Sequence, residues 1–169
     1  MDKFVKLLHE AETIEQDGHR YYLNSMDKTE NKFAKELFKK LAEEEIVHYN
    51  RIKQIAEMLT EGRKISKSDI QLSGKSGKVF DSLIRDMKSD QPAGSEIEAL
   101  EFAKKLEEKS IAHYKNAMKA TIDTNVLEFL AQLVIEEEGH LRSIKDSIEY
   151  IEDPQAWFSR KERSHFDGA

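Results

Sequence analysis

The two halves of the chain repeat each other at a constant spacing of 92 residues. The first half contains IEQDGHRYY (14–22) and LAEEEIVHYNRIK (41–53), which resemble LEEKSIAHY (106–114) and LVIEEEGHLRSIK (133–145) in the second half. A fixed spacing across two separate segments, with no insertion between them, indicates two equivalent structural units. We therefore expect pseudo-twofold symmetry, with each half contributing matching side chains to a shared centre.

Four long stretches carry apolar residues at helical spacing, at about residues 2–25, 29–59, 95–117 and 123–151. With seven glycines and two prolines among 169 residues, the chain has too few turn residues for an all-β fold. The connections between the first two helices and between the last two are only a few residues long, which favours antiparallel hairpins. The sequence thus predicts an all-α protein built from two helical hairpins.

A long crossover at residues 60–94 is expected to join the hairpins. It is rich in Gly, Ser and Lys and contains one short helical candidate, Val79 to Met87. A 30-residue helix is about 45 Å long at ~1.5 Å per residue. An extended segment covers ~3.3 Å per residue, so it can run back along that length. We expect one antiparallel four-helix bundle over residues 1–152, because neither hairpin alone buries its apolar stripe.

Pro154 is expected to end the fourth helix, because proline lacks an N–H group and its ring clashes with the preceding turn. The remaining residues, 153–169, form a short C-terminal helical tail in this interpretation. Trp157 and Phe158 are expected to pack on the bundle as an apolar cap. A dimer contact is the functional alternative for these two aromatic residues.

Composition excludes several classes of function. The chain has no cysteine, which excludes disulfides, thiolate zinc sites and iron–sulfur clusters within these residues. Its net charge is −6 and its basic residues are scattered, so nucleic acid is a poor partner. No apolar run approaches the ~20 residues of a membrane span. The first residues, MDKFVKLLHEAE, contain charge too early for a signal peptide, and we expect a cytoplasmic protein with no membrane partner.

The repeat superposes four pairs of chemically active residues on the apolar stripes of the helices. They are Glu15/Glu107, Tyr22/Tyr114, Glu45/Glu137 and His48/His140. Residues three apart share a helical face, so each Glu-x-x-His offers a carboxylate and an imidazole to one point. Four carboxylates in one core are costly unless positive charge accompanies them, and two divalent cations balance them. This donor set suits iron or manganese.

A single Glu-x-x-His is weak evidence, and a third one, Glu162 and His165, lies in the tail with no apolar stripe and no repeat partner. His19 follows Glu15 by one turn, but its repeat partner is Ile111, which favours a packing or solvent-edge role. The remaining glutamates of the charged runs are expected on solvated faces; these are Glu12, Glu43, Glu44, Glu108, Glu136 and Glu138.

The tyrosines at the repeat positions have two interpretations. Tyr22 and Tyr114 lie seven residues after Glu15 and Glu107, about 10 Å along the helix axis, which is too far to bind the same metal ions. A hydrogen bond to a metal-ligating carboxylate of a neighbouring helix is the functional interpretation. Plain core packing is the alternative.

The order Glu-x6-Tyr, Glu-x-x-His, Glu-x6-Tyr, Glu-x-x-His, together with EQDGHRYY, EEEIVHYNRI and LEEKSIAHY, resembles the rubrerythrin-type di-iron domain of the ferritin-like superfamily. The resemblance spans about Phe4 to Ile151 and implies a ferritin-like bundle. It implies that His48 and His140 each bind one iron. Glu15 and Glu107 complete the ligand set of the two expected iron ions, for which manganese or zinc are substitutes. By resemblance to bacterioferritin, Glu45 and Glu137 bridge the two irons.

Two departures from the family pattern affect the expected function. Rubrerythrins proper carry a cysteine-containing rubredoxin module, so any peroxide reduction here needs an external rubredoxin-like electron donor. They also carry an additional carboxylate one turn beyond the ligand that corresponds to Glu107, where this chain has Ser110. The site therefore resembles the more symmetric bacterioferritin pattern.

Three functional hypotheses remain at this stage. The first is a di-iron oxidoreductase that reduces peroxide or dioxygen, expected as a homodimer. The second is iron handling, as a ferroxidase or a storage shell, which a very large native mass would indicate. The third is a bundle with a structural metal and no turnover, which predicts bound zinc and no colour change on oxidation.

Overall fold

The computed structural model describes residues 3–72 and 95–166, with side chains described only as far as residue 160 in the last helix. The described residues form five α-helices and one short 3₁₀ helix, without a strand, so the all-α prediction is confirmed. The α-helices are α1 (Lys3–Lys28), α2 (Lys32–Thr60), α4 (Ser95–Ala117), α5 (Thr124–Glu152) and α6 (Pro154–Phe166). The short helix η1 (Met118–Ala120) follows α4.

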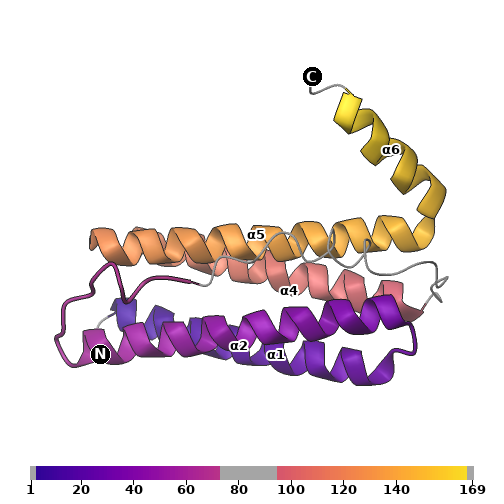
Figure 1. The fold of residues 1–169 in the computed structure, drawn as a ribbon. Helices are drawn as coiled ribbons and strands as arrows, with labels where there is room; N and C mark the ends of the chain where they lie inside the picture. Colours follow the sequence, from indigo (N-terminus) through magenta and orange to yellow (C-terminus); the bar gives the residue numbers. More distant parts are fainter. Residues whose placement is uncertain (1–2, 73–94, 167–169) are drawn as a thin grey trace.

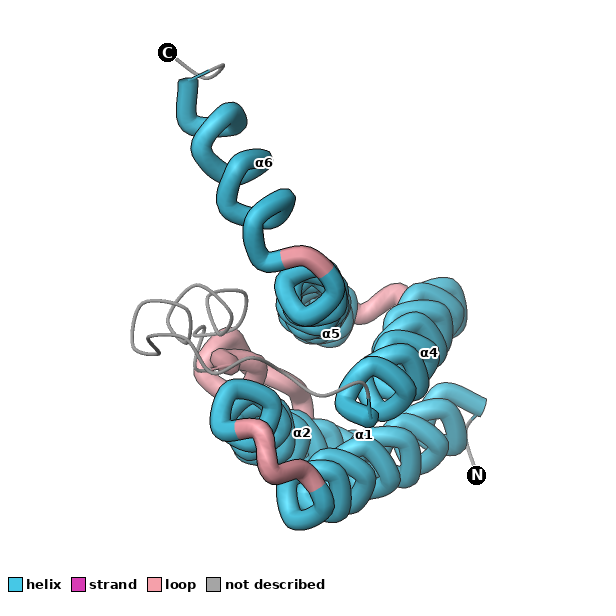
Figure 2. The backbone as a smooth tube through the Cα atoms, turned by 90° about the vertical axis from the view of Figure 1, so that its right-hand side faces the viewer, coloured by secondary structure: helices cyan, strands magenta, loops and turns pink. Residues whose placement is uncertain are grey.

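Helix α1 packs along α2, and α4 packs along α5 (Figures 1 and 2). The hydroxyl of Tyr21, late in α1, donates to the carbonyl of Ala99, early in α4, at 2.7 Å. At the other end, His113 Nε2 lies 2.8 Å from the carbonyl of Leu7. The two helices therefore run antiparallel. These two hydrogen bonds join equivalent positions of the repeat, so the sequence repeat is also a repeat of contacts.

Local sequence fixes where the helices begin and end. The Asn31 side chain caps α2 by accepting from the backbone N–H of Ala34 at 3.0 Å. Asp123 caps α5 by accepting from Asn125 and Val126 at 2.9 and 3.1 Å. Helix α5 ends at Glu152, just before Pro154, which opens α6 at the first-turn position that proline tolerates.

Two apolar clusters fill the bundle on either side of its centre. One holds Phe4, Leu8, Ile52, Ile55, Tyr114, Phe129, Leu130 and Leu133 among others. The second holds Tyr22, Leu37, Phe38, Leu41, Leu100, Ile144, Ile148 and Trp157 among others. Each Glu or Glu-x-x-His segment of the repeat lies in the chain between residues of one cluster and residues of the other. The acidic centre is therefore enclosed by apolar packing along the bundle axis.

The C-terminal tail meets the bundle through its first turn. Trp157 is buried in the second apolar cluster, with its ring centroid 5.9 Å from that of Tyr150. Phe158 is half exposed, and the rest of α6 leads away from the bundle (Figures 1 and 2). Both aromatic residues of the tail thus contact Tyr150 of α5, since the Phe158 ring centroid lies 6.0 Å from it, and Trp157 is the one that is buried. The expected short helix at Val79 to Met87, and most of the crossover at 60–94, lie outside the described residues.

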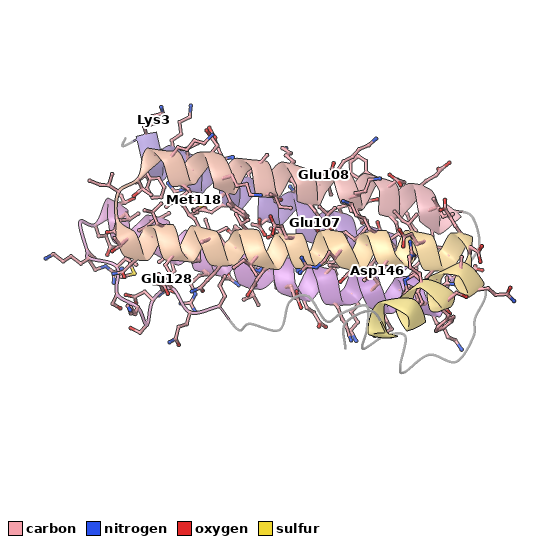
Figure 3. The ribbon with its side chains drawn as sticks, turned by 90° about the horizontal axis from the view of Figure 1, so that it is seen from above. Lys3, Glu107, Glu108, Met118, Glu128 and Asp146 are labelled. Carbon is pink, nitrogen blue, oxygen red and sulfur yellow. The ribbon has the colours of Figure 1, made fainter. Side chains whose placement is uncertain are left out.

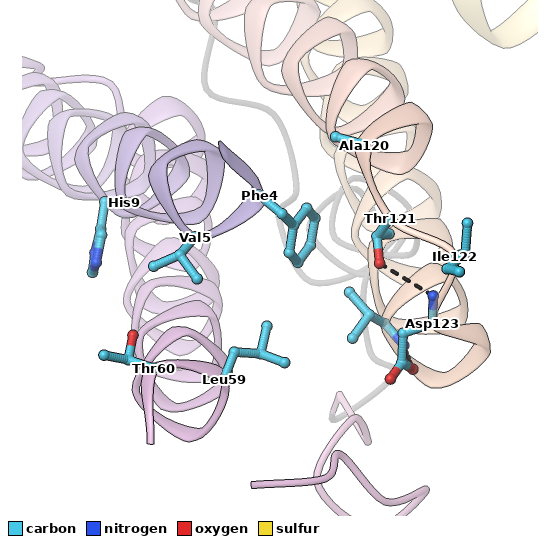
Figure 4. A pocket seen from close by; sticks show the side chains of 10 residues that line it. Phe4, Val5, His9, Leu59, Thr60, Ala120, Thr121, Ile122 and Asp123 are labelled. Carbon is cyan, nitrogen blue, oxygen red and sulfur yellow. Dashed lines mark hydrogen bonds between the residues drawn. The ribbon is translucent and has the colours of Figure 1, made fainter. Parts of the chain in front are cut away.

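No helix among the described residues is both long enough and apolar enough to cross a membrane. A cavity of about 550 Å³ lies at the end of the bundle, between the start of α1, the end of α2 and the loop before α5 (Figure 4). Phe4, His9, Leu59 and Ile122 are among its lining residues. It shares no residue with the acidic centre.

Candidate metal centre

The six candidate ligands meet in the interior of the bundle. All are buried, with exposed fractions between 0 and 3%. They are Glu15 on α1, Glu45 and His48 on α2, Glu107 on α4, and Glu137 and His140 on α5. Figure 3 shows Glu107 near the middle of the bundle, whereas its neighbour Glu108 is exposed. Helical spacing thus brings the glutamates and histidines of the repeat together in space.

These residues form two adjoining groups in which one donor atom from each member lies within 4.8 Å of the others. One group is Glu15, Glu45, His48 and Glu137, and the second is Glu45, Glu107, Glu137 and His140. Glu45 and Glu137 belong to both groups. Each group therefore has three carboxylates and one imidazole, with two carboxylates shared between two positions that could each hold a metal ion.

Several buried atoms of this centre lie close to one another but form no hydrogen bond of favourable geometry. They are Glu15 Oε2, Glu45 Oε1, His48 Nδ1 and Glu137 Oε1. Buried polar atoms in proteins are normally hydrogen bonded, and an orphan atom needs a specific reason. The four atoms are carboxylate oxygens and an imidazole nitrogen, which are the donors that bind iron and manganese. The residues therefore fit a pair of metal ions.

The two histidines face the centre with the same ring nitrogen. His48 Nδ1 lies 2.9 Å from Glu137 and 3.4 Å from Glu15, and His140 Nδ1 lies 3.0 Å from Glu137. The two imidazole rings are stacked, with centroids 5.6 Å apart. Each Nδ1 atom is thus directed at one of the two groups.

The outward nitrogen of each histidine contacts a glutamate of the opposite hairpin. His48 Nε2 lies 2.6 Å from Glu136, and His140 Nε2 lies 2.6 Å from Glu44. A proton on Nε2 that is donated to a carboxylate leaves the Nδ1 lone pair for a metal ion. The expectation that Glu44 and Glu136 lie on solvated faces is therefore wrong. Each of these carboxylates lies next to the candidate metal centre because it contacts the Nε2 atom of the histidine from the other hairpin.

Two tyrosines complete the symmetric network. The Tyr22 hydroxyl donates to Glu107, and the Tyr114 hydroxyl donates to Glu15. Both rings are fully buried, and each belongs to a different apolar cluster. The two buried tyrosines thus orient Glu107 and Glu15, the glutamates that each belong to only one of the two groups. The contact joins a tyrosine of one hairpin to a glutamate of the other.

The remaining candidates lie outside the centre. His19 Nδ1 contacts the carbonyl of Ala42 at 2.8 Å, in agreement with a packing role. Ser110 is buried, and its hydroxyl donates to the carbonyl of Leu106 on its own helix at 3.2 Å. Glu138 pairs with Lys115 at the surface, and Glu43 and Glu108 are exposed. The side chains of Glu162 and His165 lie outside the described residues.

Burial and mutual repulsion act strongly on the carboxylates of the metal-free centre. Burial, and then the charges of Glu15 and Glu137, raise the pKa of Glu45 well above its usual value. Burial and the charge of Glu137 raise the pKa of Glu107 to about 8. Burial also opposes the ionisation of Glu137, but the charges of His48 and His140 outweigh it and hold the pKa of Glu137 well below its usual value. The metal-free centre therefore favours one ionised carboxylate held between the two histidines, beside carboxyls that retain protons.

The fold and this centre define a class of protein, the helical bundles that hold metal ions between carboxylates and imidazoles in their interior. The chain belongs to the rubrerythrin family, whose sequence profile matches residues 6–148. That membership supports a di-iron carboxylate protein and implies iron binding. No curated protein and no solved structure shows significant similarity to the chain.

Proposed function

We propose that this protein is a di-iron oxidoreductase that reduces hydrogen peroxide or dioxygen with electrons from a separate donor. The observation that carries the proposal is the pair of adjoining buried groups that share Glu45 and Glu137. Family membership supports iron as the metal. In the proposed site, Glu15 and His48 complete one metal position, and Glu107 and His140 complete the second.

The charges of the proposed site balance. Four carboxylates offset two Fe(II) ions, and the two imidazoles bind as neutral rings. Two bound Fe(II) ions would supply two electrons, which with two protons reduce one H₂O₂ to two water molecules and leave two Fe(III) ions. An external one-electron donor of the rubredoxin type would then return two electrons for each turnover.

The chain's own residues would hold this site in place during the change of charge. Glu44 and Glu136 fix the tautomer and orientation of the two histidines. Tyr22 and Tyr114 hold the terminal carboxylates through their hydroxyls. The two apolar clusters exclude bulk water along the bundle axis, which strengthens the electrostatic interactions inside.

An anaerobic Fe(II) titration of the metal-free protein tests the proposal. We expect saturation at two iron ions per chain, followed by a charge-transfer band when peroxide or air is admitted. A matched pair of variants, Glu45→Ala at the shared position and Glu43→Ala at the exposed position two residues earlier, identifies the site. Glu45→Ala should lose at least one iron and Glu43→Ala should bind two. Saturation of the unaltered protein at zero or one iron would rule out the di-iron function.

A further inference from the structure

A small cavity between α1 and α4 is lined both by buried residues of the acidic centre and by exposed residues of the two helices. Its volume is about 60 Å³, room for one or two water-sized molecules at about 30 Å³ each. Its lining includes Glu45 and Glu107, two members of the group that contains His140. Neither Glu15 nor His48 of the other group lines it.

The outer wall of this cavity is symmetric. Three of its residues on α1, Ile14, Asp17 and Gly18, are the repeat partners of three on α4, Leu106, Lys109 and Ser110. The cavity thus opens where the pseudo-twofold axis passes between the two helices. Its inner wall lacks this symmetry, because Glu45 lines the cavity and its repeat partner Glu137 does not.

Gly18 is the place where Glu45 comes closest to this wall of the cavity on α1. It is buried in the interior of α1, where glycine costs about 1 kcal/mol relative to alanine. A Cβ atom at this position would lie 3.2 Å from Glu45 Oε2. Its repeat partner, Ser110, does carry a side chain. The missing side chain at Gly18 therefore allows the Glu45 carboxylate to lie close to the α1 backbone, where a Cβ atom would crowd it.

We propose that this cavity is the port through which a small neutral oxidant reaches the metal position formed by Glu45, Glu107, Glu137 and His140. We call it the Gly18 port. The exposed residues Asp17 and Lys109 line its outer part beside the half-buried side chains Ile14 and Leu106, and Asp17 also pairs with Arg20. A cavity of about 60 Å³ has room for a neutral molecule with two oxygen atoms, either dioxygen or hydrogen peroxide, and the carboxylates of Glu45 and Glu107 in its lining disfavour anions. This inference rests on the proposed function.

Nitric oxide, a neutral diatomic molecule, probes the port without turnover. The protein is loaded anaerobically with Fe(II), its iron content is measured, and the rate of absorbance change on mixing with nitric oxide is recorded. Ser110→Leu places a larger side chain in the cavity from the side opposite Gly18. Lys105→Leu adds leucine to an exposed position of the same helix and serves as the matched control.

We expect Ser110→Leu to bind two Fe(II) ions and to react with nitric oxide at least about tenfold more slowly, since tenfold corresponds to only ~1.4 kcal/mol of added barrier. Lys105→Leu should retain the original rate. Separate mixing of the same variants with dioxygen and with peroxide identifies the oxidant that uses the port as the one that is slowed. An unchanged nitric oxide rate in an iron-loaded Ser110→Leu protein would overturn the proposal and leave the di-iron function intact.

If Ser110→Leu does not fold or does not bind iron, Leu106→Phe decides the question. Leu106 is half buried and lines the port, so a larger side chain there narrows it, and Leu106 is not one of the candidate ligands. Slowed reaction with nitric oxide supports the port, and an unchanged rate overturns it. An unaltered protein that takes up no Fe(II) would remove the proposed function, and the port as an oxidant path with it.

Discussion

Glu44 lies 2.6 Å from the Nε2 atom of His140, although the two residues are 96 positions apart and belong to different hairpins. The repeat makes the same contact a second time, between Glu136 and His48. Each hairpin therefore provides a carboxylate that orients the imidazole of the other. The geometry of the candidate metal centre therefore depends on how α2 packs against α5.

Removing one of these carboxylates should weaken metal binding without removing a ligand. We expect Glu44→Ala and Glu136→Ala to lower the affinity for Fe(II) or Co(II) by roughly 10–100-fold, because the imidazole loses the acceptor that fixes its tautomer. Isothermal titration calorimetry under anaerobic conditions measures the effect. The symmetry of the contacts predicts similar losses in the two variants.

Glu43→Ala is the control for both, since Glu43 is exposed and adjacent to Glu44. Its metal affinity should equal that of the unaltered protein. Equal affinities in Glu43→Ala and Glu44→Ala would show that the outward glutamates do not support the histidines.

The sequence was sufficient to predict the helices and the residues that meet at the centre, because both follow from periodicity. Apolar spacing located four helices to within a few residues, and the constant repeat spacing singled out Glu15, Glu45, Glu107 and Glu137 as equivalent pairs. A residue on the apolar stripe of a long helix points toward the core of the bundle. Burial of these side chains therefore required no knowledge of the loops.

The sequence could not predict contacts that depend on how one hairpin sits on the other. Glu44 is next to Glu45, and adjacent helix positions point about 100° apart, so its own helix places it off the apolar stripe. Only the position of His140 on α5 brings it to the centre. The repeat did contain a usable signal, because Glu44 and Glu136 are also separated by 92 residues. The close approach of Glu45 to Gly18 likewise depends on how α2 packs against α1.

Tyr22→Phe and Tyr114→Phe should destabilise the metal-free protein. Each removes a hydroxyl donor from a buried carboxylate, Glu107 or Glu15, and an unsatisfied buried group costs about 1–3 kcal/mol. For a chain of this length the melting temperature should fall by roughly 2–4 °C per kcal/mol. Thermal unfolding followed by circular dichroism measures it. Tyr49→Phe, which alters a tyrosine outside the centre, should have little effect on the melting temperature. Equal stability of all three variants would contradict the orienting role of Tyr22 and Tyr114.

Substituting the two shared glutamates, Glu45 and Glu137, should change the melting temperature of the metal-free protein in opposite directions. Burial and the charges of its neighbours disfavour ionisation of Glu45 and raise its pKa, so Glu45→Gln should raise the melting temperature of the metal-free protein. Glu137 is the ionised partner of His48 and His140. Glu137→Gln should lower the melting temperature by about 6 °C or more, because breaking a buried ion pair costs about 3–5 kcal/mol. A rise in both variants would show that the carboxylates only repel one another.

Both variants should also lose at least one bound metal ion, because both groups contain both residues. Iron content after anaerobic loading and desalting measures this. Normal binding of two ions by either variant would overturn its assignment as a shared ligand.

The stability of the metal-free protein should fall as the pH rises. Burial, and then the charge of Glu137, raise the pKa of Glu107 from 4.5 to about 8, so the folded state binds this proton more tightly than the unfolded state. That contribution to stability is complete below pH 4.5 and is lost as the pH rises to about 8. Burial lowers the pKa values of His48 and His140, but the charge of Glu137 and hydrogen bonds to neighbouring carboxylates outweigh it and raise them. These raised pKa values act in the same direction above pH 6.5, where the unfolded histidines lose their protons. The lowered pKa of Glu137 acts in the opposite direction, but its contribution is lost only as the pH falls below 4.5.

We therefore expect the melting temperature of the metal-free protein to drop by several degrees between about pH 5.5 and 8.5, since ~1 kcal/mol corresponds to roughly 2–4 °C for a chain of this length. Glu107→Gln, which cannot ionise, should reduce this drop. Metal binding must displace the same protons, so the stabilisation by added metal should grow over the same pH range, with proton release detectable in weakly buffered solution. A metal-free protein that becomes more stable from pH 5.5 to 8.5 would show that the buried carboxyls are ionised throughout, and the described balance of charges at the centre would be wrong.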